Sequence, residues 1–350
     1  MAHSGTIGSK EPVAWQPGGA TLTITNDVAA WREAREGVAI WDCSHWGLLK
    51  LSGADCRRFL HNQTTNNINT LAPGQGADTI FVTSTGRTLD LATAYVTEDG
   101  ILILVSPNRR NFLKQWMDRF IFPMDQVELT DISDEFAIFT LIGPESAALL
   151  EKLEIPTLDR QPVGSHLTAN LDEVPIRLAA GSGLSLPGYT LFVPAETSQP
   201  IWSRLVAAGA LPLSDQAWEC LRVQQGRPFP DRELTEDYNA LEAGLWYAIA
   251  FDKGCYIGQE TIARLNTYKG VKQRLWGIRL DRAAAPGTPV TADGAKVGIL
   301  TSYAQIEGGH WGLAYVRTKA GGSGLTVEVG AASGGLVSLP FVGHEYYTGS

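Results

Sequence analysis

Apolar and polar residues in the first half of the chain follow two different periods, one typical of strands and one typical of helices. Short segments rich in apolar and β-branched residues predict strands at 46–52, 79–83, 88–96, 101–105, 126–130 and 136–142. The turn Glu98-Asp99-Gly100 joins two of these strands as a hairpin. Amphipathic segments, most of them bounded by polar caps, glycine or proline, predict helices at 26–36, 54–61, 109–122 and 144–153. This irregular order predicts an α+β fold rather than a regular βαβ series.

The second half begins with a segment, 154–175, whose three prolines and many polar residues predict a long loop. A strand is expected at 189–193, and helices are expected at 198–208, 214–225 and 258–265. From about Lys272, strand-like pieces alternate with glycine-rich turns, which is typical of a small β-barrel. We therefore divide the chain into an N-terminal tail (1–25), a body of two α+β lobes (26–270) and a C-terminal antiparallel β-barrel (271–350).

The composition is that of a globular protein, with 44% hydrophobic and 19% charged residues. A formal net charge of −9 repels phosphate backbones and argues against a nucleic-acid partner. The apolar runs are too short to cross a bilayer, and the first residues lack the apolar core of a secretory signal. We therefore expect a cytoplasmic protein without a membrane partner, or a protein of the plastid stroma if a plant transit peptide has been removed. The four cysteines form no CxxC pair and the histidines show no metal-ligand spacing, so we expect no stably bound metal.

The segment Lys253–Glu260 gathers a cation, a thiol, an aromatic ring, an amide and a carboxylate around two glycines. The glycines allow unusual backbone conformations and the close approach of another chain or a ligand. Cys255 lies just before a predicted helix and close to Lys253, and both neighbours favour the thiolate. A buried, apolar cysteine is the alternative, but the polar surroundings favour a function, and we predict Cys255 and Lys253 as catalytic. The remaining cysteines lie in packing patterns and are interpreted as structural: Cys43, Cys56 and Cys220.

The octapeptide K-G-C-Y-I-G-Q-E resembles the signature of the YgfZ family of folate-binding proteins, which are relatives of the glycine-cleavage T-protein. The resemblance extends from about Trp31 to Phe341 and is especially close to cyanobacterial and plastid members. It implies a three-part cloverleaf around a central channel that holds tetrahydrofolate or a one-carbon-substituted folate. It also implies a monomer that acts in the assembly or repair of iron–sulfur proteins, as mitochondrial relatives do, with those client or assembly proteins as partners.

The resemblance and the residue types together give a set of candidate folate-binding residues: Asn67, Asp90, Arg109, Tyr189, Arg222, Tyr256, Gln259 and Glu260. Arginine binds carboxylates through two parallel hydrogen bonds, which suits the anionic tail of a folate. Three candidates also have a plain alternative: Asp90 and Arg109 as solvated side chains, and Arg222 in an ion pair with Glu219.

The chain departs from the T-protein at positions that matter for chemistry. The T-protein signature is roughly K-x-D-F-I-G-R-E, so Cys255 and Gln259 replace an acid and an arginine. Thr190 and Gln224 stand where the T-protein has glutamates, although a pterin ring offers N–H donors that pair well with carboxylates. These losses favour folate-dependent maintenance of iron–sulfur proteins. A folate-dependent aminomethyltransferase and a non-catalytic scaffold that docks a partner are the alternatives.

Overall fold

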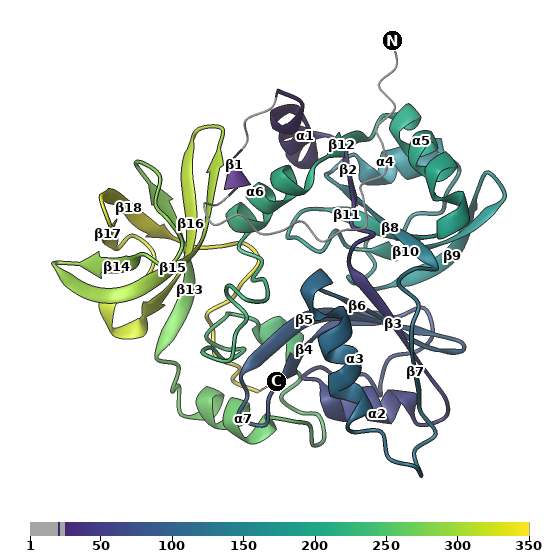
Figure 1. Ribbon diagram of the computed structural model, residues 1–350, viewed down its shortest axis with the longest axis horizontal. Helices are drawn as coiled ribbons and strands as arrows, with labels where there is room; N and C mark the ends of the chain where they lie inside the picture. Colours follow the sequence, from purple (N-terminus) through teal and green to yellow (C-terminus); the bar gives the residue numbers. More distant parts are fainter. Residues whose placement is uncertain (1–19, 22–24, 350) are drawn as a thin grey trace.

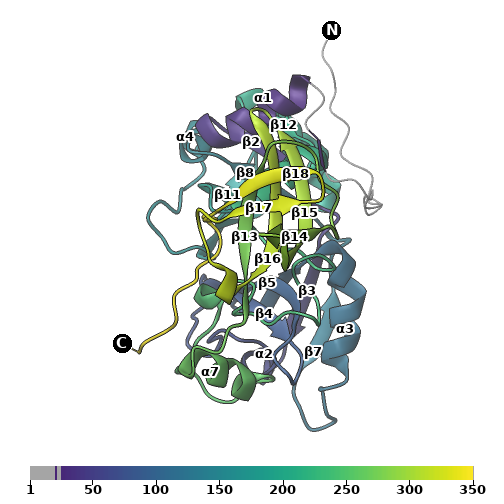
Figure 2. The same ribbon diagram turned by 90° about the vertical axis from the view of Figure 1, so that its left-hand side faces the viewer.

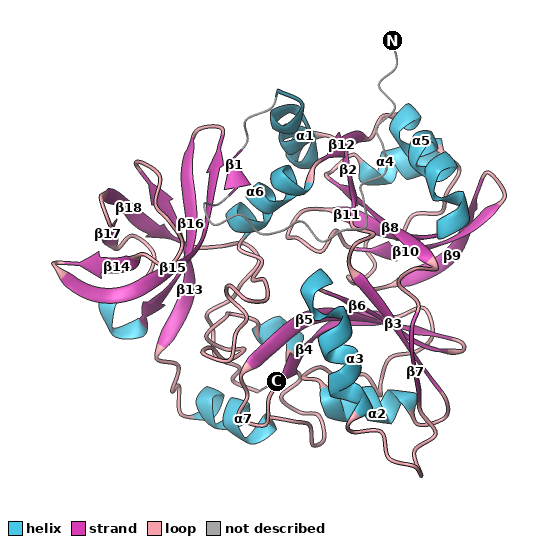
Figure 3. Cartoon of the chain, in the orientation of Figure 1, coloured by secondary structure: helices cyan, strands magenta, loops and turns pink. Residues whose placement is uncertain are grey.

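The computed structural model describes residues 20–21 and 25–349, which form three lobes around a common centre (Figure 1). Two lobes each combine a sheet with helices, and the third is a β-barrel (Figure 3). The chain begins the second lobe with strand β2 (Ala39–Asp42), crosses over to build the first lobe, and returns to complete the second. This is the three-part α+β architecture that the sequence predicts.

The first lobe contains a five-stranded antiparallel sheet in the order β4-β5-β6-β3-β7. Its strands are β3 (Gly47–Ser52), β4 (Gly76–Val82), β5 (Thr88–Thr97), β6 (Gly100–Val105) and β7 (Glu128–Asp131). Its helical elements are α2 (Cys56–Gln63), the 3₁₀ turn η1 (Pro107–Arg109) and α3 (Arg110–Asp118). Leu60 of α2 and Leu113 of α3 share one apolar core with Ile103 of the sheet. The strands predicted at 79–83, 88–96 and 101–105 are confirmed as β4, β5 and β6, and so is the hairpin between the last two.

The second lobe contains a six-stranded sheet in the order β12-β2-β8-β11-β10-β9, in which only β12 and β2 run parallel. The strands after β2 are β8 (Phe136–Ile142), β9 (His166–Leu171), β10 (Val174–Ala180), β11 (Gly188–Pro194) and β12 (Leu211–Leu213). The helical elements are α4 (Ser146–Lys152), η2 (Ala195–Thr197) and α5 (Ser198–Ala208). Leu150 and Leu205 of the two α-helices pack with Phe139 of the sheet in a second apolar core.

The third lobe is a closed barrel of six antiparallel strands, because β15 pairs with β14 on one side and with β16 on the other (Figure 2). Its elements are β13 (Gln273–Leu280), β14 (Pro289–Ala292), β15 (Ala295–Ile306), β16 (Gly309–Arg317), η4 (Thr318–Ala320), β17 (Thr326–Val329) and β18 (Ala332–Val337). The short strand β1 (Ala20–Thr21) adds in parallel to β15. The predicted small antiparallel barrel is confirmed.

The remaining helices connect the lobes: α1 (Thr25–Glu36), α6 (Asp215–Gln225), η3 (Trp246–Ala248) and α7 (Gln259–Thr267). Helix α6 lies between the second lobe and the barrel (Figure 1), and an apolar core that includes Trp218 and Tyr315 joins these parts. The Ser214 hydroxyl caps α6 by accepting a hydrogen bond from the Ala217 N–H. Gly226 ends the helix with a left-handed φ of 84°.

Two predictions of secondary structure are wrong in part. The loop predicted at 154–175 contains the edge strand β9 and the first two residues of β10. Pro156 and Pro162 precede β9, and Pro175 lies at the start of β10, before its pairing with β11 begins. Its hairpin turn uses Asp172 and Glu173, with φ of 48° and 66°, where glycine or asparagine would have signalled the turn. The helix predicted at 109–122 ends at Asp118, because the next amides bond to carbonyls only three residues back.

Candidate functional site

A cavity of about 520 Å³ lies where the two α+β lobes meet α6 and the C-terminal segment. The first lobe contributes residues of β4, β5 and β6, and the second contributes residues of β8, β10 and β11. Residues 340–343 leave the barrel and close another part of the wall. The Phe341 N–H fixes this segment by donating to the Gln225 carbonyl. The centre of the molecule therefore holds one cavity built from segments that lie far apart in the sequence.

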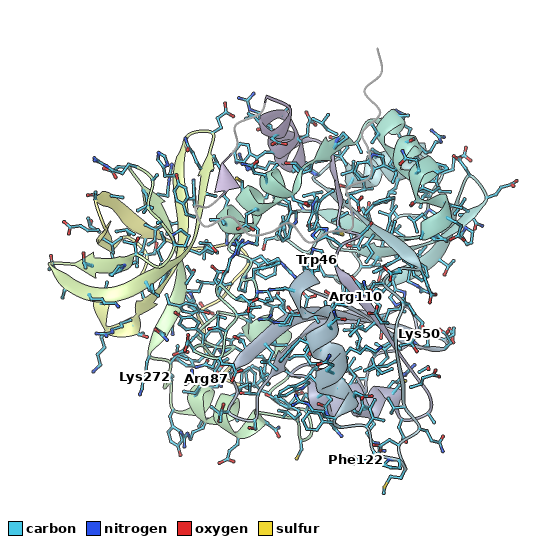
Figure 4. All side chains as sticks on the ribbon, viewed as in Figure 1. Trp46, Lys50, Arg87, Arg110, Phe122 and Lys272 are labelled. Carbon is cyan, nitrogen blue, oxygen red and sulfur yellow. The ribbon has the colours of Figure 1, made fainter. Side chains whose placement is uncertain are left out.

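Three tryptophans form one wall of this cavity. Trp41 and Trp218 stack with ring centroids 4.2 Å apart, and Trp46 packs edge-on against both. Figure 4 shows Trp46 near the middle of the molecule, between the lobes. Trp41 donates to Asp215 at 2.7 Å, whereas the buried indole N–H of Trp218 has no hydrogen-bond partner among the described residues. Such a wall suits a flat, aromatic ligand that also offers a hydrogen-bond acceptor.

The polar lining includes both a carboxylate and a guanidinium. Asp78 of β4 accepts hydrogen bonds from the Thr93 hydroxyl at 2.6 Å and from the Tyr247 hydroxyl at 3.4 Å. Arg227 enters from the turn after α6 and is 4% exposed. Thr190 also lines the cavity and donates to the Gly181 carbonyl. The cavity can therefore pair with both donors and acceptors of a ligand.

The Lys253–Glu260 segment lies outside this cavity, in the loop that leads into α7 and the first two residues of that helix. Lys253 is buried, and its ammonium group donates to the carbonyls of His61, Thr64 and Asn66 at 2.5, 2.6 and 2.7 Å. Burial lowers the pKa of Lys253 to about 7. The three acceptors oppose this shift, because a neutral amine has only two N–H donors. Lys253 therefore fastens its loop to the C-terminal end of α2 and the residues that follow it, and its side chain does not line the cavity.

The other motif residues divide between buried and exposed positions. The buried ring of Tyr256 lies 4.7 Å from the Lys253 ammonium, and the Gln259 amide donates to the Lys253 carbonyl. Cys255 and Glu260 are exposed to solvent. The structure thus brings Lys253, Tyr256 and Gln259 together and leaves the thiol at the surface.

The two glycines of the motif play different parts. Gly258 has a left-handed φ of 81°, and a Cβ placed there would lie 2.6 Å from the Thr83 carbonyl oxygen. The close approach at this glycine is made by the chain's own backbone, whereas the sequence predicted an approach of another chain or a ligand. Gly254 has no positive φ, and its Cβ would only touch His61 at 3.9 Å. The expectation that Gly254 adopts a conformation closed to other residues is wrong.

A different cysteine lines the cavity. The Cys43 thiol donates to the Ile138 carbonyl at 3.3 Å and lies 3.4 Å from the Thr140 hydroxyl. Burial raises the pKa of this thiol, so Cys43 stays protonated and is a poor nucleophile. Cys43 is therefore a neutral part of the wall.

Two candidates for folate binding are held by other protein groups. Asp90 is fully buried and accepts from both the hydroxyl and the N–H of Ser106. Burial raises its pKa to about 6, so the interpretation of Asp90 as a solvated side chain is wrong. Arg109 donates to the Leu89 carbonyl and forms an ion pair with Asp231. Neither side chain lines the cavity.

The remaining candidates also point elsewhere. The Tyr189 hydroxyl donates to Asp159 at 2.8 Å, from a ring buried in the core of the second lobe. Arg222 is fully buried and bonds to Glu219 and Glu233, so the ion-pair interpretation of this residue is the correct one. The buried side-chain oxygen of Asn67 has no hydrogen-bond partner among the residues that the structure describes.

None of the ten predicted site residues lines the central cavity. The sequence interpretation missed the groups that do, among them Asp78, Tyr247 and Arg227. One feature of the sequence could have identified Asp78: it is a charged residue in a strand whose last three residues are apolar. Another could have identified Arg227, because it follows directly after a helix-stopping glycine.

The described part of the chain holds no group of three or more His, Cys, Asp or Glu side chains that could bind a metal ion. Within the same residues, no helix is long and apolar enough to span a membrane.

Comparisons with known proteins give a consistent result. The family model of the GCVT N-terminal domain matches residues 8–253. A chloroplastic protein of Arabidopsis thaliana, named as a candidate transferase, is 43% identical over 331 residues, which cover 94% of this chain and 77% of that protein. An aminomethyltransferase of Rubrobacter xylanophilus is 28% identical over 313 residues, covering 88% of this chain and 84% of that enzyme.

A solved structure shares the fold. Glycine cleavage system aminomethyltransferase T from Bartonella henselae superposes with a TM-score of 0.78 at 17% identity, over 92% of this chain and 91% of that one. The three-part fold with its C-terminal barrel is therefore the fold of that aminomethyltransferase.

Proposed function

The chain belongs to the family of the GCVT N-terminal domain, and on that premise we propose that it binds tetrahydrofolate, or a one-carbon-substituted folate, in the central cavity. The observation that carries the proposal is the lining of the cavity. Its volume of about 520 Å³ falls in the range of roughly 300–1,000 Å³ that is typical of small-molecule sites. The tryptophan wall suits a pterin ring, Asp78 suits its N–H donors, and Arg227 suits an acceptor oxygen.

The same proposal assigns the motif thiol to a second task, the assembly or repair of iron–sulfur proteins. Cys255 is exposed, so a client protein can reach it without entering the folate cavity. One thiol cannot complete the four-thiolate ligand set of a typical cluster. A client protein or an external thiol would therefore supply the other ligands, and the cluster would be cargo. The similarity to a chloroplastic protein supports a plastid setting for this role.

Aminomethyl transfer is the competing function, because several relatives are named aminomethyltransferases. Thr190 argues against it, because this threonine lines the cavity where the T-protein pattern has a glutamate. Asp78 is the one carboxylate among the lining residues that the structure describes. Folate-dependent release of ammonia from an aminomethylated lipoyl carrier by the purified protein would favour this function.

Calorimetric titration with tetrahydrofolate under anaerobic conditions tests the folate proposal. We expect the wild type and Cys255→Ser to bind equally, because Cys255 lies outside the cavity. Asp78→Asn should bind on the order of tenfold more weakly, because it loses a charge-assisted hydrogen bond. A wild-type protein that does not bind tetrahydrofolate would refute the proposal.

A cell-based comparison tests the role in iron–sulfur maintenance. In cells that lack the protein, we expect the wild type to restore the activity of iron–sulfur enzymes. Cys255→Ser should fail to restore it, although it folds and binds folate normally. Full restoration by Cys255→Ser would show that the thiol is not used.

A further inference from the structure

Arg227 is a buried cation without a described counter-ion. Its Nη1 donates to the Gly183 carbonyl at 2.9 Å, and its guanidinium carbon lies 5.3 Å from the Trp46 ring centroid and 5.5 Å from that of Phe341. Its Nε is buried without a hydrogen-bond partner, and no ion pair joins it to a described carboxylate. The side chain is 4% exposed and lines the cavity.

A second buried arginine, Arg222, differs from Arg227 because protein groups surround its guanidinium with acceptors. Arg222, five positions earlier, bonds to two glutamates, a hydroxyl and a carbonyl, so its charge is compensated within the protein. Arg227 has one carbonyl acceptor and two aromatic rings instead. An uncompensated buried charge destabilises a folded protein. A charge of this kind is retained in a binding cavity when a ligand compensates it.

Two carboxylates belong to the surroundings of Arg227, but neither is a described ion-pair partner of its guanidinium. Asp78 lines the same cavity but accepts from Thr93 and Tyr247. Burial raises the pKa of Asp90, both of whose oxygens accept from Ser106, and the charge of Arg227 acts in the opposite direction on that pKa. The guanidinium is therefore left for a group that enters the cavity.

We propose that Arg227 is the residue that recognises an oxygen acceptor of the bound folate. The acceptor is either a carboxylate of the glutamate tail or the carbonyl oxygen of the pterin ring, and both offer the lone pairs that a guanidinium binds. This inference rests on the proposed folate binding and adds the group that fixes the ligand's orientation. Arg227 also gives this cavity a positive charge, whereas the T-protein pattern has a glutamate at the lining position Thr190.

Titrations of the full-length protein with three ligands test the assignment: tetrahydrofolate, a tetrahydropterin without the tail, and p-aminobenzoylglutamate. We expect Arg227→Met to weaken tetrahydrofolate binding on the order of 30-fold, the effect of losing a charged hydrogen bond. Arg227→Lys keeps the charge but not the fork of donors, so its affinity for tetrahydrofolate should lie between those of the wild type and Arg227→Met. A matching loss for the tetrahydropterin identifies the ring carbonyl, whereas a loss limited to ligands with a glutamate identifies the tail.

Arg274→Met is the matched control, because Arg274 also packs on an aromatic ring and has a buried, unpartnered Nε but does not line the cavity. We expect this variant to bind as the wild type does. Arg227→Met should also keep or raise the midpoint of unfolding without ligand, because it removes an uncompensated charge, whereas a structural role would lower that midpoint.

The inference is overturned if Arg227→Met binds tetrahydrofolate within about threefold of the wild type, a difference below 1 kcal/mol. It is also overturned if Arg274→Met weakens binding equally. A wild type that binds no tetrahydrofolate refutes the proposed function as well, so the two failures are distinguishable.

Discussion

Replacement of Arg222 by methionine separates a structural role from a role in ligand binding. Arg222 donates to Glu219 twice at 2.7 Å, to Glu233 at 3.0 Å and to the Ser302 hydroxyl of β15 at 2.8 Å. It therefore ties α6 to the barrel. Glu219 keeps an ion pair with Arg232 in the variant, but Glu233 loses its cation while it stays fully buried.

Loss of one partner from a buried ion pair costs about 3–5 kcal/mol. For a chain of 350 residues, an unfolding entropy of about 2.1 cal/mol/K per residue makes a loss of about 4 kcal/mol equivalent to about 5 °C in Tm. The double variant Arg222→Met/Glu233→Gln should recover part of this loss, because it no longer buries an uncompensated carboxylate.

Urea unfolding followed by tryptophan fluorescence measures the free energy of unfolding for the wild type, both single variants and the double variant. Tetrahydrofolate affinity is measured on the same samples, and we expect it to be unchanged wherever the protein is folded. The reasoning is refuted if Arg222→Met unfolds within about 0.5 kcal/mol of the wild type, as a surface substitution would. A normal stability combined with lost folate binding would restore Arg222 as a ligand residue.

Three further predictions concern single positions. Lys253→Met should lower the free energy of unfolding in urea by about 2–4 kcal/mol, because three carbonyls lose a charged donor. The control Lys272→Met, at an exposed position, should stay within about 0.5 kcal/mol of the wild type. Equal losses in the two variants would contradict the bonding seen for Lys253. Burial lowers the pKa of His166 from 6.5 to about 4, so the unfolded state binds more protons between these pH values. The stability that neutral His166 contributes is complete above pH 6.5 and is lost as the pH falls through 4, by up to about 1.4 kcal/mol per pH unit. His166→Gln should flatten the slope of unfolding free energy against pH in this range. A variant whose pH profile runs parallel to that of the wild type would contradict the prediction. Gly258→Ala should cost more than Gly287→Ala, since both have positive φ but only the first Cβ meets a backbone oxygen, at 2.6 Å; thermal unfolding compares the two, and equal midpoint shifts would show that the contact has no effect.

Local features of the sequence determined much of the fold. Ser214 and Gly226 set the ends of α6 because a cap and a left-handed residue act over a few neighbouring positions. The turn at Glu98–Gly100 and the strands around it are likewise decided by neighbours along the chain. Glycine-rich turns between short strands, with no helix expected among them, predicted the barrel, since closure of such a sheet leaves no unpaired strand edge.

The tertiary structure alone decided where the chemistry is. A residue's type does not show which element it will face. Lys253 is therefore interpreted from the sequence as a partner of Cys255, yet it donates to carbonyls at the end of α2 and just after it. The cavity brings Asp78, Trp218 and Arg227 together from separate lobes and turns, at sequence distances over which no local pattern operates. Only packing of the lobes determines which buried side chains find protein partners, and within the described residues it leaves the Nε of Arg227, which lines the cavity, without one.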